Sequence, residues 1–296
     1  GADAAKLKAL WQRLYRPQDV ALIVVGDFDA AKVEAAIKAH FADWRAPAAV
    51  AQPDPGPFDF ALAGKTDVYL DPALPERVTV SRTGPYQDEP DTVANRQQQL
   101  LRLIGYGIVN RRLQRLAREG DPPFRAARLG TGDVFKAGRT TSLVVDAGDG
   151  EWRRALATAE REYRRALEFG FTPAEVAEQV ANLRTAQENA AAGAATRNNA
   201  TFVALALSLL HDERIPTTPE SSLERFNDLA RAITPEAVLA ALEHELVPLD
   251  NPMIRFEGRT APQGGAEALR AAWNPGMAEP LAQLDDAAIA DFAYTD

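Results

Sequence analysis

The side chains best suited to metal binding or proton transfer are few and scattered in this sequence. The only histidines are His40, His211 and His244, and no two of them lie within one helical turn of each other. His211 and His244 stand in the acidic triplets HDE and EHE, but adjacent residues on a helix point about 100° apart, so neither triplet can close a metal site alone. We therefore predict that this chain contains no metal ligand, no catalytic residue and no cofactor-binding residue, and that His40 is structural.

Nucleophilic and phosphate-binding chemistry finds equally little support. The chain has no cysteine, which excludes disulfides, thiolate–zinc sites, iron–sulfur clusters and thiol nucleophiles. Ser142 and Ser208 have no histidine at a spacing that indicates a serine hydrolase. The glycine-rich stretches at 130–133 and 148–150 lack the pattern of a phosphate-binding loop, so we expect ordinary turns at both.

The charged residues leave more alternatives open. Three arginines spaced along one expected helix form a basic stripe, which three further arginines extend: Arg111, Arg115 and Arg118, then Arg112, Arg125 and Arg128. A solvated face paired with carboxylates is the favoured interpretation, and contact with a peptide is the alternative. The glutamate pairs Glu160/Glu162 and Glu175/Glu178 have acid–base spacing, but without geometry they cannot be told from solvated helix faces.

Composition bounds the class of protein. The 296 residues suffice for one large or two ordinary domains, and 46% of them are hydrophobic and 25% charged, as in a globular protein. A net charge of -9 opposes binding to nucleic acid, so we expect no nucleic-acid partner. The longest apolar run, ATFVALALSLL at 200–210, is about half the length that a bilayer requires, so we also expect no membrane span. The absence of cysteine suits the cytoplasm and the periplasm equally well.

Hydrophobic periodicity predicts which elements position these residues. A helix at 5–14, a strand buried on both faces at 20–25 and a second helix capped by Asp29 open the chain. Strands follow at 67–70 and 77–83, and then a helical region at 90–118, which we expect to be broken near Gly105 and Gly107. Two strands joined through residues 136–138 form an antiparallel hairpin. The rest is mostly helical.

Threonine followed by proline marks three of the later helix starts. Residues 172–175 read TPAE, a capping box with proline at the first helical position, and Phe171 and Val176 can form the adjacent hydrophobic staple. Thr218 and Thr234 are each followed by proline in the same way. We therefore expect helices to begin at about residues 173, 219 and 235.

An internal repeat relates the two ends of the chain. A shift of 232 residues, without a gap, pairs apolar residues with apolar residues and one glycine with another: Leu7 with Leu239, Leu10 with Leu242, Leu14 with Leu246, Leu22 with Ile254, Val24 with Phe256, Gly26 with Gly258, Ile37 with Leu269 and Phe41 with Trp273. These pairs cover a helix, a strand, a glycine turn and a second helix. We infer that the same terminal unit occurs twice, although helix–strand–helix units are common enough that the offset could be coincidental.

The first of these two segments also resembles a known family. It reads LYRPQDVALIVVGDFDAAKVEAAIKAHFADW, with Tyr15, Pro17, the Gly-Asp-Phe of residues 26–28, Phe41 and Trp44, and is similar to the region in which domains of the pitrilysin/insulinase family of zinc metallopeptidases approach their end. The stretches at 110–130 and 169–190 look like later parts of a domain of this family. The resemblance, of varying strength, covers most of residues 5–260.

The resemblance implies a fold and an activity, but not an active site in this chain. Members of the family are built from repeated α+β domains, each a largely antiparallel sheet covered by helices, in pairs that enclose a substrate chamber. Active members carry the inverted zinc motif H-x-x-E-H in the first domain, and this chain does not contain it. The family also uses an arginine and a tyrosine of a partner domain, in a region like residues 118–124. Here the aromatic residue is Phe124, which has no hydroxyl, so we do not transfer that role.

The internal repeat and the family resemblance together imply a metallopeptidase-like α+β duplicated domain that is not itself catalytic. We expect residues 1–46 to be the C-terminal tail of a preceding homologous domain, 47–64 a linker, 65–275 a complete pitrilysin-like domain and 276–296 an extended tail or linker. Its expected partners are the preceding catalytic domain of the same protein and a peptide or unfolded polypeptide substrate. Zinc is expected in the full-length protein and not in this segment. The alternative is an inactive family member that acts as an assembly scaffold or peptide-binding subunit.

Overall fold

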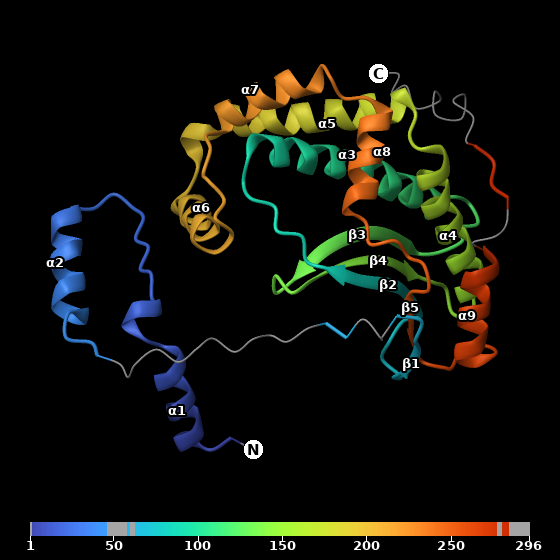
Figure 1. Cartoon of the computed structure of the whole chain (residues 1–296), viewed down its shortest axis with the longest axis horizontal. Coiled ribbons are helices and arrows are strands. Elements are labelled where there is room, and N and C mark those ends of the chain that lie inside the picture. Colours follow the sequence, from blue (N-terminus) through green and yellow to red (C-terminus); the bar gives the residue numbers. More distant parts are fainter. Residues whose placement is uncertain (1, 46–57, 60–62, 277–279, 284–296) are drawn as a thin grey trace. The chain divides into compact units, whose positions relative to one another are not determined.

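The computed structural model describes residues 2–45, 58–59, 63–276 and 280–283 (Figure 1). Most of the linker predicted at 47–64 and of the tail predicted at 276–296 therefore lies outside the described residues. The chain divides into two compact units, Gly1–Asp54 with Ala192–Thr218, and Pro55–Ala191 with Pro219–Asp296. Each unit is described by itself below.

The first unit contains three helices with polar N-caps. Helix α1 (Ala4–Leu14) is capped by Asp3, α2 (Ala30–Phe41) by Asp29 and α6 (Asn199–Asp212) by Asn198, each side chain accepting a hydrogen bond from a backbone N–H of the first turn. Two short 3₁₀ helices, η1 (Pro17–Asp19) and η3 (Ala194–Thr196), lie in the connections. None of the three α-helices has a fully buried residue.

The strand expected at 20–25 does not form. Residues 20–25 belong to no helix or strand and pair with no strand within the described part of the chain. Leu22 is 56% exposed and Val24 44% exposed. An extended apolar segment becomes a strand only when a neighbouring strand accepts its backbone hydrogen bonds, and none is placed beside this one.

The second unit is built on a five-stranded sheet in the order β1-β5-β2-β4-β3. The strands are β1 (Thr66–Leu70), β2 (Arg77–Pro85), β3 (Ala126–Val134), β4 (Gly138–Asp146) and β5 (Met253–Gly258). Only β1 and β5 run parallel, and the other three pairings are antiparallel. The strands predicted at 67–70 and 77–83 and the predicted hairpin are thus present, and the largely antiparallel α+β fold class is confirmed.

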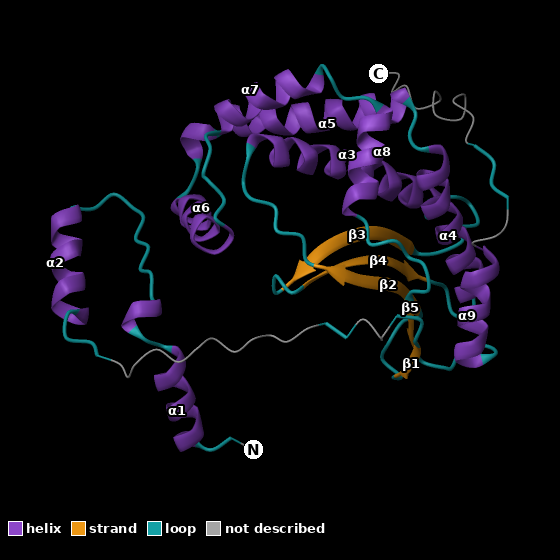
Figure 2. Cartoon of the chain, viewed as in Figure 1, coloured by secondary structure: helices purple, strands orange, loops and turns teal. Residues whose placement is uncertain are grey.

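One face of this sheet forms the floor of the core. Buried side chains alternate along β2, β4 and β5 and line up across the strands in two apolar rows. One row contains Phe256, Val78, Val145 and Ala127, and the next contains Ile254, Val80, Leu143 and Leu129. Figure 2 shows helices stacked over the sheet, and α3 (Val93–Leu116) and α4 (Trp152–Phe169) contact its strands.

Helix α3 is continuous, so the expected break near Gly105 and Gly107 is wrong. Its 24 residues run past both glycines, and a Cβ on Gly105 would lie 3.3 Å from Leu242 of α8 (Pro235–Glu245). A Cβ on Gly107 would lie 2.7 Å from the amide oxygen of Gln179. These glycines let neighbouring side chains approach the helix, and tertiary packing outweighs their low helix propensity.

Three further helices begin where the threonine–proline pairs predict. Helix α5 (Pro173–Ala192) has the expected capping box, because the Thr172 N–H donates to Glu175 at 3.0 Å and the Glu175 N–H donates to the Thr172 hydroxyl at 3.2 Å. Phe171 and Val176 are both buried beside it. Helices α7 (Pro219–Ala230) and α8 begin at the predicted prolines, and α9 (Gly265–Gly276) follows β5.

The two segments related by the 232-residue shift have the same order of elements. Both α1 and α8 have 11 residues, and both α2 and α9 have 12. In each case an extended segment lies between the two helices, but only the second of these segments, β5, is paired in a sheet. The likeness agrees with a repeated unit, which stays a prediction.

No described helix is both long enough and apolar enough to cross a membrane.

Candidate functional site

The three histidines lie on three different helices. His40 is exposed in α2 beside Phe41, His211 lies near the end of α6, and His244 is exposed in the last turn of α8. Within the described ranges, no three His, Asp or Glu side chains are grouped closely enough to hold a metal ion. Glu245, the neighbour of His244, instead belongs to the polar network described below.

Residues 118–124 are the region that the resemblance compares with the family's carbonyl-binding arginine and tyrosine. Of the arginine and the aromatic residue here, only the aromatic residue points inward. Arg118 is exposed just after α3, whereas Phe124 is only 2% exposed and belongs to the hydrophobic core. A phenyl ring also has no hydrogen-bond donor, so this position offers no phenol hydroxyl.

One of the two glycine stretches is a strand and not a turn. Residues 130–133 lie in the middle and end of β3, which corrects the expectation of a turn at this position. Residues 148–150 do form a turn before α4, where Glu76 accepts hydrogen bonds from the N–H groups of Gly150 and Trp152 at 3.0 and 2.9 Å. Gly150 has a φ of 82°, a conformation that suits glycine.

The glutamates with acid–base spacing are each paired with an arginine. Glu160 binds Arg164, Glu162 binds Arg165, Glu175 binds Arg112 and Glu178 binds Arg111. Glu160, Glu162 and Glu175 are buried, so they do not form solvated helix faces. The neighbouring carboxylates therefore neutralise separate cations.

The arginines of the basic stripe include both exposed and buried side chains. Arg111 is half-exposed and pairs with Glu178, and Arg125 pairs with Asp149 at 3.4 Å, as a solvated face predicts. Arg112 lies next to Arg111 in sequence but is buried, and its side chain binds Glu175 through two nitrogens, at 2.6 and 2.7 Å. Arg112 is therefore part of the interior and not an extension of the stripe.

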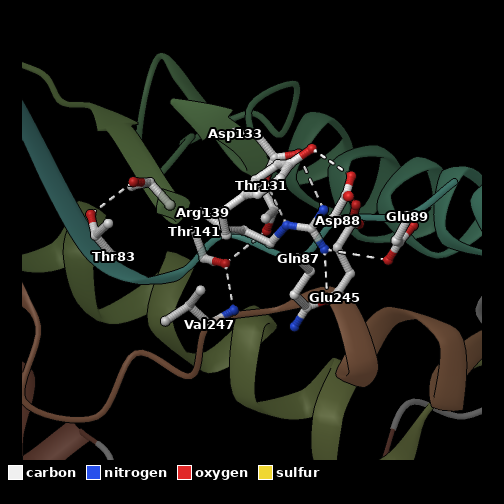
Figure 3. A network of polar contacts seen from close by, with 12 residues as sticks. Thr83, Gln87, Asp88, Glu89, Thr131, Asp133, Arg139, Thr141, Glu245 and Val247 are labelled. Carbon is white, nitrogen blue, oxygen red and sulfur yellow. Dashed lines mark hydrogen bonds and ion pairs between the residues drawn. The ribbon is translucent and has the colours of Figure 1, made fainter. Parts of the chain in front are cut away.

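A network of polar contacts continues the buried face of the β3–β4 hairpin (Figure 3). Beyond the apolar rows, the next rung of this face pairs Thr131 with Thr141, and the last pairs Asp133 with Arg139. The face thus changes from apolar to polar within two rungs. Arg139 is 5% exposed, so a full cation lies at the end of the core.

Arg139 is held by groups from two sides. Its Nε and Nη2 donate to the two carboxylate oxygens of Asp133 at 2.8 and 3.1 Å, and its Nη1 donates to Gln87 at 2.8 Å. Glu89 lies 3.6 Å from Nη1. Figure 3 shows Arg139 between the hairpin and the loop that carries Gln87 and Glu89. This geometry ties the loop after β2 to the end of the hairpin.

Helix α3 supplies a second cation and a tyrosine, one turn apart. Arg102 binds both oxygens of Glu89 at 2.7 and 2.8 Å and lies 3.8 Å from Glu245 of α8. Tyr106 donates its hydroxyl hydrogen to Thr131 at 2.6 Å. In turn, Thr141 accepts from the backbone N–H of Val247, just after α8, at 2.8 Å. We call this set, which joins α3, α8, the hairpin and the loop after β2, the Arg139 network.

Hydrogen bonding and burial shift the pKa values of two carboxyl groups of the Arg139 network in opposite directions. Hydrogen bonds from Arg102 hold the pKa of Glu89 below its ordinary value, despite partial burial. Burial raises the pKa of Glu245, and the nearby Arg102 and Arg139 offset only part of that effect. Burial also raises the pKa of Tyr106. Glu89 is therefore held ionised, whereas Glu245 binds a proton more readily than a free glutamate.

The Arg139 network was not predicted from the sequence. Its members come from residues 87–89, 102–106, 131–141 and 245–247, and no local motif connects them. One signal was available: Thr131, Asp133, Arg139 and Thr141 occupy the same alternate positions as the buried Leu129 and Leu143. Polar residues that continue a core-facing alternation have to find partners inside the protein.

The fold, with its two-layer α+β unit and preceding helical segment, is the fold of a peptidase half. The chain is similar to the first half of the periplasmic protease PqqL from Escherichia coli, with 18% identity and a TM-score of 0.74 over 95% of this chain and 61% of that chain. It is similar to the ferredoxin protease FusC in complex with Arabidopsis ferredoxin, with 17% identity and a TM-score of 0.71 over 96% of this chain and 32% of that one.

A third similar structure is a peptidase M16 inactive domain from Pseudomonas fluorescens. It shares 20% identity and a TM-score of 0.61 over 88% of this chain and 59% of its own. The chain thus spans between about a third and three fifths of the proteins whose structures it matches. No curated protein was found with a matching sequence.

A family model settles the class. The model described as the peptidase M16 inactive domain matches residues 1–183, which is more than half of the chain. The chain therefore belongs to the peptidase M16 family, and the resemblance to insulinase-like proteases is confirmed. It is an inactive domain of that family.

Proposed function

We propose that this chain supports the preceding catalytic domain of a zinc peptidase and closes the chamber around a peptide substrate. Residues 2–45 provide the attachment to that domain. The zinc ion and its H-x-x-E-H ligands belong to the preceding domain, which performs the hydrolysis. The chain by itself cleaves no peptide.

The observation that carries this proposal is a difference in burial between the two related segments. Leu22 and Val24 are 56% and 44% exposed, whereas their counterparts Ile254 and Phe256 in β5 are completely buried. The same holds in the helices, where Leu10 and Phe41 are exposed and their counterparts Leu242 and Trp273 are buried. Apolar surface of this extent is typical of a face that another part of a protein covers.

The second copy supplies a template for the covering part. There β5 lies between β1, to which it is parallel, and β2, to which it is antiparallel, and α8 packs on α3. By analogy, residues 20–25 enter a sheet of the preceding domain between one parallel and one antiparallel strand. Helix α1 then covers the long helix of that domain as α8 covers α3.

Sheet edges support a role in holding an extended peptide. Strand β2 lies inside the sheet between β5 and β4 and has no free edge, whereas β1 lies at one end of the strand order. Strand β3 lies at the other end. An extended peptide adds to an edge strand through backbone hydrogen bonds, so β1 and β3 are the strands that suit this function.

Hydrogen exchange tests the attachment directly. In the 296-residue chain alone, the amides of residues 20–25 should exchange rapidly, because no strand in the described part of the chain pairs with them. In the longer protein that includes the preceding domain, the same amides should become protected by at least about 100-fold, as in a paired strand. The amides of β5 serve as the control and should be protected in both proteins. Equal, rapid exchange of residues 20–25 in both proteins would remove the basis of the proposal.

Peptidase assays separate the proposal from the scaffold alternative. The isolated chain should bind no stoichiometric zinc and should not hydrolyse an unfolded polypeptide. The longer protein should bind zinc and hydrolyse the polypeptide if its first domain carries H-x-x-E-H. A longer protein that protects residues 20–25 but lacks the motif and the activity would be an inactive scaffold. One tightly bound zinc ion per isolated chain contradicts both functions.

A further inference from the structure

Helix α6 carries apolar side chains for which the proposed function has no use. Its stretch ATFVALALSLL, at 200–210, contains no charged residue, yet no residue of the helix is fully buried. Its large side chains have exposed fractions of 39 to 53%: Phe202, Leu207, Leu209 and Leu210. A helix without a charged face is normally surrounded by protein. Among the described residues, α6 therefore lacks the covering that its sequence predicts.

The four exposed side chains form one continuous face of α6. Successive residues of a helix are rotated by about 100°, so these four positions fall within roughly 160° of its circumference. The opposite side carries Thr201 and Ser208, which are partly buried. Arg197 lies 4.9 Å from the centre of the Phe202 ring, at the N-terminal end of the face. An apolar face of this width is typical of a helix that packs on another part of a protein.

Helix α6 belongs to the same compact unit as the attachment segment. In sequence, residues 192–218 lie between α5 and α7 of the second unit, yet they group with residues 1–54. A Cβ on Gly26 would lie 3.7 Å from Nδ2 of Asn199, the first residue of α6. Gly26 directly follows residues 20–25, which are proposed to enter a sheet of the preceding domain. A domain that covers those residues therefore also reaches the start of α6.

Charge argues against a lipid surface as the partner of this face. Helices that lie on membranes carry lysine and arginine on their polar side. Helix α6 contains neither between Arg197 and Arg214, and Asp212 and Glu213 stand at its end. The net charge of -9 also opposes anionic lipids. An apolar protein surface suits α6 better.

We propose that α6 is a second docking element for the preceding domain, which covers the exposed face of α6 with apolar side chains of its own. This inference rests on the proposed attachment through residues 2–45 and adds residues 202–210 to it. Domains joined by a small contact move relative to each other, whereas a larger apolar interface holds them in one orientation. Helix α6 thus fixes the orientation in which this domain closes the chamber.

Thiol labelling tests the docking, because the chain has no cysteine of its own. L209C reports on α6 and L22C on the attachment segment. R231C is the control, because the side chain of Arg231 is 80% exposed and polar. N-ethylmaleimide labels each variant in the 296-residue chain and in the longer protein, and mass spectrometry of the peptide that carries the residue gives the rate. L209C should react at least about tenfold more slowly in the longer protein, and R231C equally fast in both.

Photo-crosslinking identifies what covers the face. In the longer protein, benzophenone maleimide attached to L209C should form crosslinks with the preceding domain of the same chain. In the 296-residue chain it should form no crosslink to another copy. Two results would assign the face to a different partner and overturn the proposal. One is crosslinking to a second copy in either protein, and the other is binding of the 296-residue chain to phosphatidylglycerol vesicles that L209E abolishes.

The labelling rates of L22C and L209C separate this inference from the proposed function. If only L22C reacts more slowly in the longer protein, the preceding domain docks on residues 2–45 alone, and the inference fails while the proposed function stands. If neither variant slows, the proposed function fails as well. Slow labelling of L209C alone also overturns the inference, because the covering part would not be the domain that binds residues 20–25.

Discussion

Arg139 lies at the point where the buried face of the β3–β4 hairpin turns from apolar to polar, and three groups depend on it. Asp133 and Gln87 accept its hydrogen bonds, and Glu89 lies 3.6 Å from it. Removing Arg139 leaves Gln87 and the partly buried Glu89 without one of their cationic neighbours, whereas the side chain of Asp133 is 38% exposed and can be solvated by water. We expect R139A to lower the free energy of unfolding by about 1 to 3 kcal/mol in urea denaturation.

An exposed arginine of the same sheet is the matched control for R139A. Arg255 in β5 pairs with Asp67 at 2.8 Å, but both side chains are more than a third exposed. Screening by water leaves such pairs with little net effect, so R255A should cost about 1 kcal/mol or less. A loss for R255A equal to that for R139A would show that burial does not determine the difference.

Glu245 predicts a distinctive pH dependence of stability. Burial raises its pKa, so the folded state binds the proton more tightly than the unfolded chain does. Its contribution to stability is therefore complete below the ordinary glutamate pKa of about 4.3 and is lost as the pH rises through the raised value. E245Q is neutral at every pH, so its free energy of unfolding relative to the unaltered chain should increase as the pH rises over this range.

Glu89, in the same network, should change stability with pH in the opposite direction. Arg102 lowers its pKa, so its contribution to stability is present above about pH 4.3 and is lost as the pH falls through the lowered value. E89Q should therefore be most destabilising at neutral pH and least destabilising in acid. Urea denaturation of both variants between about pH 3 and about pH 8 measures the two slopes. Parallel curves for E245Q and the unaltered chain would contradict the assignment.

At the scale of elements, the two glycines of α3 should respond differently to substitution. A Cβ on Gly105 meets Leu242 at 3.3 Å and Val238 at 3.5 Å, both in the core, so a large side chain must push α8 away. G105L should destabilise the chain by about 1 to 3 kcal/mol through overpacking. Thermal or urea denaturation measures the loss.

Gly107 is the control within the same helix. A Cβ at this position would first meet the end of the flexible Gln179 side chain, which can move aside. Alanine also has a helix propensity about 1 kcal/mol better than glycine. G107A should therefore be neutral or stabilise the chain by up to about 1 kcal/mol. Destabilisation by G107A as large as that by G105L would mean that both glycines are required for packing.

Local signals predicted most helix starts, and long-range contacts decided the rest. The capping box at Thr172 and Glu175 is complete within four residues, so the sequence alone specifies it. The continuity of α3 depends on α8, which lies more than a hundred residues further on, and glycine propensity alone indicated a break. The Arg139 network also depends on contacts between segments that are far apart in the sequence. Only the alternation along β3 and β4 indicated it.

At the scale of the molecule, equivalent residues of the two related segments should differ in their effect on stability. Ile254 is completely buried between β1 and β2, so I254A should cost about 2 to 5 kcal/mol. Leu22, its counterpart, is largely exposed, so L22A should change the free energy of unfolding by less than about 0.5 kcal/mol in the isolated chain.

In the longer protein, L22A and I254A should have similar effects on stability. With the preceding domain present, residue 22 is proposed to lie inside a sheet, and L22A should then destabilise that domain by an amount similar to I254A in this one. Denaturation of both variants in both proteins gives the comparison. A negligible effect of L22A in the longer protein would contradict the proposed strand pairing. Sequence periodicity could indicate a strand at residues 20–25, but it could not identify the strands that pair with it.

The position of β5 has a consequence for protein synthesis. The ribosome releases β1 and β2 early, yet the strand that joins them comes almost last, after the hairpin and most of the helices. Until that strand emerges, β1 has no neighbour and the nascent sheet keeps a gap, so translation of nearly the whole unit must precede its closure. Premature termination before Met253 should therefore release a chain that chaperones and proteases recognise as unfinished.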